Sequence, residues 1–131
     1  MAGKVLLVDD DSDIRKFVRT VLEEHGYDTI EAANGDEGYK KVRDEKPDLV
    51  ILDVLMPRQS GIKMYRMLRI DDQLKSIPVI IFSAISKRTF LRSQEALSEF
   101  GGTKVPEPDA YVEKPVEPHE LAEVIKTVIE Q

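Results

Sequence analysis

Five polar side chains stand directly after short apolar runs in this sequence. They are Asp9, Asp10, Asp53, Ser83 and Lys114. Clustered carboxylates raise one another's pKa unless a cation joins them, and Mg²⁺ prefers hard oxygen ligands of this kind. An aspartate can accept a phosphoryl group as an acyl phosphate, while a metal ion, a lysine and a hydroxyl bind the transferring oxygens. These residue types therefore indicate a magnesium site with a carboxylate nucleophile.

Each of these residues also has an ordinary structural explanation when it is taken alone. An aspartate after a strand commonly begins a turn or caps a helix, and Asp11, Ser12 or Asp13 is expected to cap the helix after the first run. A single serine is usually a satisfied turn hydroxyl, and a single lysine is usually a solvated surface charge. Their joint occurrence after successive apolar runs is what favours a shared site.

The elements that would position these side chains alternate along the chain. We expect strands near residues 5–8, 27–32, 49–53, 79–82 and 110–112, and helices near 14–25, 36–44, 61–70, 87–100 and 118–130. Strict alternation predicts an α/β fold, with helices on both faces of a parallel sheet. The strands of such a sheet end along one edge, so the five polar side chains would meet there.

Composition narrows the class of protein further. The 131 residues suit one domain, and 41% hydrophobic with 34% charged residues is typical of a globular protein. A net charge of −6 predicts no direct nucleic-acid binding, and the lack of cysteine excludes disulfides and thiolate sites. Because the N-terminus leads directly into a strand, we expect no signal peptide, no membrane insertion and a cytoplasmic location.

Taken together, these motifs resemble the receiver domain of two-component response regulators, the CheY-like family. The matching pieces are Val8-Asp9-Asp10, Asp53-Val54-Leu55-Met56-Pro57 with Gly61, Ser83-Ala84, and Tyr111 with Lys114-Pro115. The resemblance covers essentially the whole chain and implies a single receiver domain over residues 1–131, with a core of about 4–130. It also implies a flavodoxin-like, doubly wound (βα)5 fold, whose five-stranded parallel sheet has the order 2-1-3-4-5.

The resemblance assigns the phosphoacceptor and the metal ligands. Asp53 would accept a phosphoryl group from a histidine kinase or a histidine phosphotransfer protein. Mg²⁺ would be held directly by Asp10 and Asp53, through water by Asp9, and by the main-chain carbonyl of Leu55. The chain would catalyse only its own phosphorylation and dephosphorylation, and would otherwise not be an enzyme.

The resemblance also implies a switch. Lys114, Ser83 and Ala84 would bind the phosphoryl oxygens, and the peptide bond before Pro115 would be cis. Phosphate would draw the Ser83 hydroxyl towards it, and Tyr111 would turn inward. That change would remodel the face made by the fourth helix, the fifth strand and the fifth helix, where a downstream protein target is expected to bind.

Two features depart from the family pattern. The segment from about 87 to 109, which includes the fourth helix and the loop after it, is lengthened, so partner recognition there cannot be copied from a typical member. Leu55 and Ile85, each two positions beyond a site residue, are apolar. We expect both to shield the acyl phosphate from water and to slow its hydrolysis.

Several alternatives stay open. A phosphohydrolase of the haloacid dehalogenase type could use Asp9 and Asp11 as its Asp-x-Asp motif, although no Asp pair follows the last strand and no cap fits this length. A receiver that binds without phosphorylation conflicts with the complete acceptor chemistry, and an acidic first loop disfavours flavin. A stand-alone regulator is favoured over a receiver from a larger or hybrid protein, and phosphorylation-dependent dimerisation is an open alternative.

Overall fold

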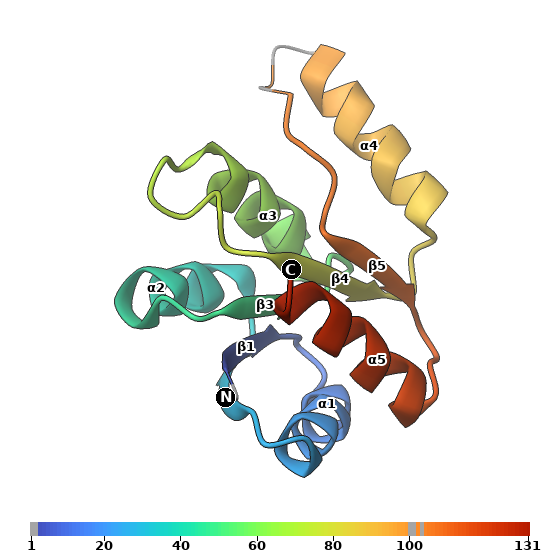
Figure 1. Cartoon of the computed structure of the whole chain (residues 1–131). Helices are drawn as coiled ribbons and strands as arrows, with labels where there is room; N and C mark the ends of the chain where they lie inside the picture. Colours follow the sequence, from blue (N-terminus) through green and yellow to red (C-terminus); the bar gives the residue numbers. More distant parts are fainter. Residues whose placement is uncertain (1–2, 100–101, 103) are drawn as a thin grey trace.

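A computed structural model describes residues 3–99, 102 and 104–131 of the chain. Strands and helices alternate along it, with a short 3₁₀ turn, η1, before α3 (Figure 1). The elements are β1 (Lys4–Val8), α1 (Ser12–Glu24), β2 (Asp28–Ala32), α2 (Gly35–Glu45), β3 (Leu49–Leu52), η1 (Pro57–Gln59), α3 (Ser60–Ile70), β4 (Val79–Ser83), α4 (Lys87–Glu99), β5 (Ala110–Glu113) and α5 (Pro118–Ile129). The predicted alternation is therefore confirmed.

The strands form one parallel sheet in the order β2-β1-β3-β4-β5. β1 pairs with β2 on one side and with β3 on the other, and β4 joins β3 to β5. The α/β class and the strand order are both confirmed. The more exposed strand, β2, lies at an edge of the sheet. Since all strands are parallel, their carboxyl ends lie along one edge.

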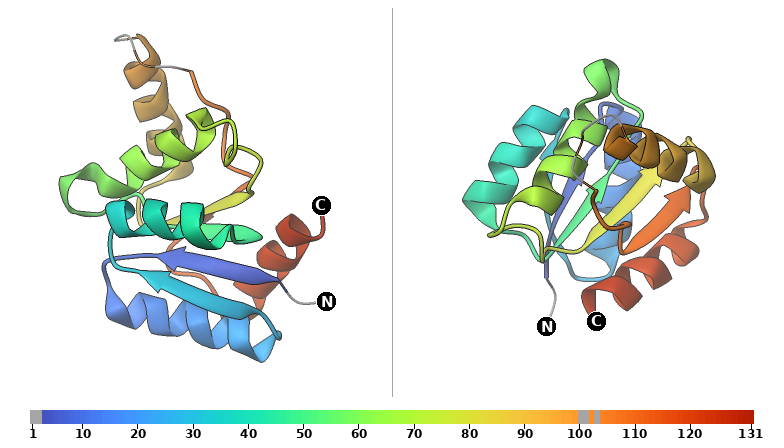
Figure 2. Two further views of the ribbon diagram at one scale, coloured as in Figure 1. Left: turned by 90° about the vertical axis from the view of Figure 1, so that its left-hand side faces the viewer. Right: turned by 90° about the horizontal axis from the view of Figure 1, so that it is seen from above.

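Helices cover both faces of the sheet. Figure 2 shows α1 and α5 on one side, with α2 and α3 on the other, where α4 also packs. Side chains of β3 alternate between the two hydrophobic cores: Leu49 and Ile51 face α1 and α5, whereas Val50 and Leu52 face α2 and α3. Burial on both faces explains why this strand is apolar at every position.

Local side-chain chemistry sets several helix ends. The Asp11 carboxylate accepts hydrogen bonds from the main-chain N–H groups of Asp13 and Ile14, so it is the residue that caps α1. The Asn34 side chain caps α2 in the same manner. Gly26 follows the end of α1 with a φ of 81°, a left-handed conformation that glycine adopts without steric cost.

The loop between β3 and α3 is tightly folded. Arg58 and Gln59 have φ angles of 60° and 55°, although neither is glycine, and the sequence pattern did not predict the 3₁₀ turn that contains them. A Cβ atom on Gly61 would lie 2.1 Å from the main-chain oxygen of Asp53. The absence of a side chain at Gly61 thus allows α3 to begin directly against Asp53, the residue that follows β3.

The segment that leads into β5 is anchored to α3. The Tyr65 hydroxyl donates a hydrogen bond to the main-chain carbonyl of Pro106. The Arg69 guanidinium forms an ion pair with Asp109 at 2.7 Å and donates to the carbonyl of Ile77 at 3.1 Å. Because the side chain of Arg69 is only 6% exposed, a buried charge helps to hold this segment.

α4 buries only part of its apolar side chains. Phe90 is buried and Leu91 packs against the core, but Leu97 is 41% exposed. The predicted helix end at Phe100 and the stop at Gly101 lie outside the described residues.

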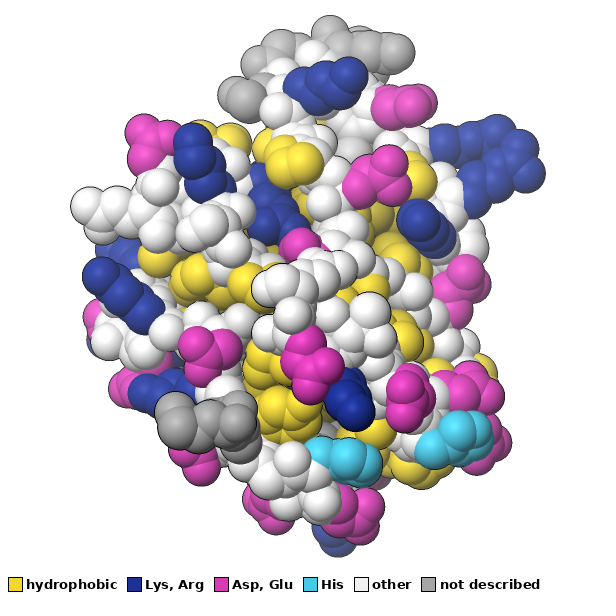
Figure 3. All heavy atoms as spheres, viewed as in Figure 1, with side chains coloured by type: hydrophobic (Ala, Val, Ile, Leu, Met, Phe, Trp, Pro, Cys, Tyr) yellow, Lys and Arg dark blue, Asp and Glu magenta, His cyan; other side chains and the backbone are white. Residues whose placement is uncertain are grey.

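The face drawn in Figure 3 carries both acidic and basic side chains. None of the described helices combines the length and the apolar character that crossing a membrane requires.

Replacement of Gly61 by alanine tests the close approach of α3 to Asp53. The added methyl group would meet main-chain atoms, which cannot rotate away, so Gly61→Ala is expected to lower the free energy of unfolding by at least about 1–3 kcal/mol. Gly38→Ala is the comparison: its methyl group would lie 2.8 Å from the sulfur of Met64 and 2.9 Å from Cγ2 of Val8, and its loss of stability should be smaller because side-chain atoms can shift more readily than main-chain atoms. Urea unfolding measures both, and equal stability of Gly61→Ala and the parent chain would contradict the packing described.

Candidate functional site

Three charged side chains meet at the carboxyl ends of β1, β3 and β5. Nζ of Lys114 lies 2.8 Å from Oδ2 of Asp9 and 3.4 Å from Oδ2 of Asp53. The Asp9 and Asp53 side chains are only 6% and 5% exposed, and that of Lys114 is 17% exposed. One ammonium group is thus shared between two buried carboxylates, and it offsets the repulsion between them.

Main-chain hydrogen bonds fix where these residues stand. The N–H of Asp53 donates to the carbonyl of Val8 at 2.9 Å, and the N–H of Lys114 donates to the carbonyl of Ser83 at 2.9 Å. Each residue is therefore tied to the end of the neighbouring strand. The Lys114–Pro115 peptide bond is cis.

The acidic residues offer a set of ligands for a metal ion. Carboxylate oxygens of Asp9, Asp10 and Asp53 lie within 4.8 Å of one another. Asp9 and Asp53 are buried while Asp10 is exposed, so the group opens to solvent on one side. Mg²⁺ takes a few carboxylates and keeps several water molecules, and these residues fit it. The Leu55 carbonyl as a further ligand stays a prediction.

Burial and ion pairing shift the pKa values of the site residues in opposite directions. Burial raises the pKa of the Asp9 carboxyl above its usual value, and the hydrogen bonds from Lys114 and from the main chain of Asp11 reverse this only in part. Burial by itself would lower the pKa of the Lys114 ammonium. Its hydrogen bond to Asp9 and the charge of Asp53 outweigh burial, so the pKa of Lys114 is raised and the group stays positive at neutral pH.

Ser83 and Tyr111 both form hydrogen bonds with the main chain of Ile85. The N–H of Ile85 donates to Oγ of the fully buried Ser83 at 3.4 Å, and the Tyr111 hydroxyl donates to the Ile85 carbonyl at 2.6 Å. The Tyr111 ring also packs against Phe90 of α4, with 5.6 Å between ring centroids. Burial is the main cause that raises the pKa of Tyr111 to about 12, so its hydroxyl keeps its proton.

The remaining predicted residues surround this group. The N–H of Leu55 donates to Oδ1 of Asp53 at 2.9 Å, while its side chain is 56% exposed. Ala84 is exposed directly after Ser83, and Ile85 is partly buried. The structure thus places Leu55 and Ile85 beside the site, and their proposed effect on hydrolysis stays a prediction.

Two contacts at the site were not foreseen from the sequence. Nζ of Lys114 lies 5.3 Å from the centroid of the Phe82 ring, a cation–π contact, and Arg15 donates to the carbonyl of Asp9 at 2.7 Å. Phe82 resembled an ordinary core residue of its apolar run. Arg15 carried one weak signal, its place in the first turn of the helix that follows the acidic residues.

Comparison with known proteins identifies the family. The model of the response regulator receiver domain matches residues 5–126, and the chain belongs to that family. It is therefore a receiver domain of two-component response regulators, proteins of phosphorylation-activated signalling rather than metabolic enzymes. The Mg²⁺-binding acidic pocket of receiver domains corresponds here to the cluster of Asp9, Asp10 and Asp53.

Individual relatives agree with this assignment. The chain is 35% identical over 98% of its length to the phosphate regulon transcriptional regulatory protein PhoB of Pseudomonas aeruginosa, but spans only 53% of that protein. It is 32% identical to the polar-differentiation response regulator DivK of Brucella anthropi, and the match spans 98% of both chains. The signal receiver domain of a histidine kinase from Syntrophus aciditrophicus superposes with a TM-score of 0.82 at 32% identity, over 98% of this chain and 91% of that one.

The raised pKa of Asp9 predicts how stability depends on pH. Between the unfolded pKa, near 3.8, and the higher folded pKa, the folded chain binds more protons than the unfolded chain. Stability of the parent chain should therefore fall as pH rises through that window in metal-free buffer. Asp9→Asn removes the ionisable group, so it should be more stable than the parent at neutral pH, and the gain should vanish below the window.

Urea unfolding with a chelator present, at a series of pH values, measures this difference. Glu23→Gln, which removes an exposed charge from α1, serves as the control and is expected to show no such pH-dependent gain. An Asp9→Asn variant less stable than the parent chain at neutral pH would contradict the prediction.

Proposed function

We propose that this chain is a single receiver domain that accepts a phosphoryl group on Asp53, with Mg²⁺, from a histidine kinase or a histidine phosphotransfer protein in the cytoplasm. The observation that carries the proposal is the shared Lys114 ammonium. It pairs a buried Asp53 with a second buried acid, and a third acid lies within metal-binding distance. The chain catalyses only its own phosphorylation and dephosphorylation.

In the transfer, a bond forms between a carboxylate oxygen of Asp53 and phosphorus, while the bond from phosphorus to the donor breaks. The Leu55 N–H and the Lys114 ammonium both contact the Asp53 carboxylate and orient it. Lys114 is close enough to exchange this contact for one with a phosphoryl oxygen. Asp9, Asp10 and Asp53 would hold Mg²⁺, whose positive charge would neutralise the phosphoryl oxygens.

The signal then passes through Ser83. A phosphoryl group on Asp53 offers an acceptor to the Ser83 hydroxyl and competes with the contact between Ser83 and Ile85. Because Ile85 also holds the Tyr111 hydroxyl, a shift of Ile85 changes the position of Tyr111 and its packing on Phe90. The surface of α4, β5 and α5 changes with it, and a downstream protein partner reads that surface.

Incubation with Mg²⁺ and acetyl phosphate tests the proposal. Intact-protein mass spectrometry should show the added mass of one phosphoryl group. Asp53→Asn should abolish the gain, because an amide does not form an acyl phosphate. Asp28→Asn, an exposed acid at the opposite end of the sheet, is the matched control and should retain it. No gain in the parent chain, or an equal gain in Asp53→Asn, would refute the proposal.

The apolar pair beside Asp53 predicts a long-lived acyl phosphate. Leu55→Asn together with Ile85→Glu would place polar groups where they can orient an attacking water. Dephosphorylation should become at least about tenfold faster, equivalent to about 1.4 kcal/mol of barrier. Loss of the phosphorylated mass with time, after acetyl phosphate is removed, gives both rates. An unchanged rate would show that these side chains do not shield the phosphoryl group.

A further inference from the structure

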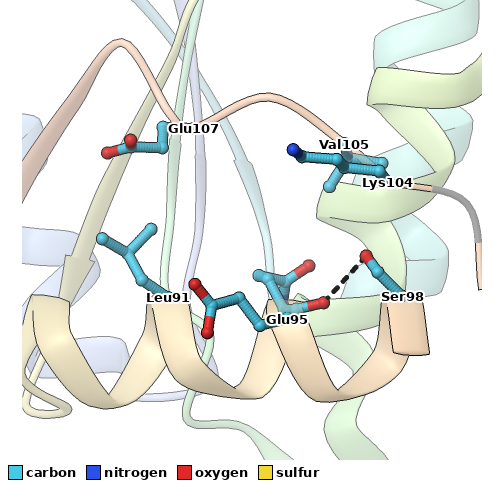
Figure 4. A pocket seen from close by; sticks show the side chains of 7 residues that line it. Leu91, Glu95, Ser98, Lys104, Val105 and Glu107 are labelled. Atoms are coloured by element: carbon cyan, nitrogen blue, oxygen red, sulfur yellow. Dashed lines mark hydrogen bonds between the residues drawn. The ribbon is translucent and has the colours of Figure 1, made fainter. Parts of the chain in front are cut away.

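A cavity of about 440 Å³ lies between α4 and the segment that leads into β5 (Figure 4). Two acids, Glu95 and Glu107, and one base, Lys104, are among the residues that line it. Because the lining carries both signs of charge, charge complementarity selects no ligand for this cavity. Arg15, in α1 on the opposite face of the sheet, forms contacts that reach the metal-binding acids.

The Arg15 guanidinium joins the ends of two neighbouring strands. Arg15 lies in the first turn of α1, and helical side chains tilt towards the N-terminus, so it reaches back to the residues that precede the helix. Its Nη1 donates to the main-chain carbonyl of Asp9, directly after β1, at 2.7 Å. Its Nε donates to Oε1 of Glu31, in β2, at 3.2 Å. Because the guanidinium is planar and rigid, contacts through two of its nitrogens fix its position.

Glu31 is a well-anchored partner for Arg15. Arg19 forms an ion pair with the other carboxylate oxygen of Glu31, and the Lys41 ammonium donates to the main-chain carbonyl of Glu31. The side chains of Arg15 and Glu31 are 20% and 29% exposed, so their ion pair is partly withdrawn from solvent. The Glu31 carboxylate therefore orients the guanidinium and offsets part of its positive charge.

The carbonyl that Arg15 binds belongs to the peptide bond between Asp9 and Asp10. Since a peptide bond is planar, a fixed carbonyl also fixes the direction of the Asp10 N–H. The Asp9 carboxylate is held by Lys114 and by the N–H of Asp11. Asp10 is exposed, and its carboxylate has no hydrogen bond or ion pair with the described residues. The position of Asp10 therefore depends on the main chain that Arg15 holds.

We propose that Arg15 is a positioning residue for Mg²⁺ binding, which holds the peptide between Asp9 and Asp10 so that the Asp10 carboxylate faces those of Asp9 and Asp53. The carboxylate oxygens of these three acids lie within 4.8 Å of one another. Arg15 is not itself a metal ligand, because a guanidinium only donates hydrogen bonds. Groups that hold metal ligands in place typically contribute about 10–100-fold to metal affinity. The inference rests on the proposed function, because it concerns the same metal site.

Titration of the full, ¹⁵N-labelled chain with Mg²⁺ alone tests this role by NMR, without phosphorylation. Shifts of the main-chain amides of Asp10 and Asp53 give the dissociation constant. Arg15→Gln should weaken Mg²⁺ binding about tenfold, because the shorter amide cannot bind Asp9 and Glu31 together. Arg15→Lys keeps the positive charge but replaces the fork by a single nitrogen, so binding should weaken severalfold.

Arg19→Gln is the matched control. It removes the same charge from the same helix, and Arg19 shares the partner Glu31 with Arg15. Within the described part of the chain, Arg19 has no hydrogen bond to Asp9, so Mg²⁺ affinity should be unchanged. Urea unfolding with a chelator present compares the stability of the variants. A purely structural role for Arg15 would lower stability and leave the Mg²⁺ affinity of the folded chain unchanged.

The outcomes separate this inference from the proposed function. Equal Mg²⁺ affinity of Arg15→Gln and the parent would overturn the positioning role, and so would tighter binding, which would mean that the charge of Arg15 only repels the metal. An equal loss in Arg19→Gln would also overturn it. A parent chain whose Mg²⁺ affinity depends on Arg15, but which gains no phosphoryl mass, refutes the proposed function alone. A parent chain that binds no Mg²⁺ refutes both.

Discussion

The pairing of Lys114 with Asp9 and Asp53 is the interaction on which the functional site depends. Two neighbouring carboxylates that are almost fully buried would not both stay ionised without a cation between them. That cation comes from the end of β5, 61 positions after Asp53. In the observed strand order its side chain must reach past the end of β4, where the Phe82 ring lies 5.3 Å from the ammonium. The site therefore exists only when these parallel strands end together.

Contacts continue from this site towards the segment that leads into β5. Ile85 binds Tyr111, Tyr111 packs on Phe90, and Phe90 meets Tyr65 edge to face at 5.5 Å. The Tyr65 hydroxyl in turn donates a hydrogen bond to the main-chain carbonyl of Pro106. Packed interiors favour discrete arrangements over gradual deformation, so such a series can take two states. Conversion of a 1% population into 99% needs about 5.5 kcal/mol, which several charge-assisted hydrogen bonds to a phosphoryl group can supply.

The sheet and the core of the site were predictable because they follow from local pattern and a general rule. Apolar runs such as Leu49 to Leu52 mark buried strands, and parallel strands bring their following residues to one edge. Features that depend on contacts between distant residues were not predictable. Arg58 and Gln59 adopt left-handed backbone conformations, although neither is the glycine that would have predicted one. The ion pair between Arg69 and Asp109 joins residues 40 positions apart.

Site mapping of the acyl phosphate tests the central claim, phosphoryl transfer to Asp53, most directly. The chain is treated with Mg²⁺ and acetyl phosphate and reduced with borohydride, whose hydride converts an aspartyl phosphate into homoserine, and its peptides are then sequenced by mass spectrometry. We predict homoserine at position 53 alone. Homoserine in place of Asp9, Asp10 or Asp13, with Asp53 unchanged, would contradict the assignment of the phosphoacceptor.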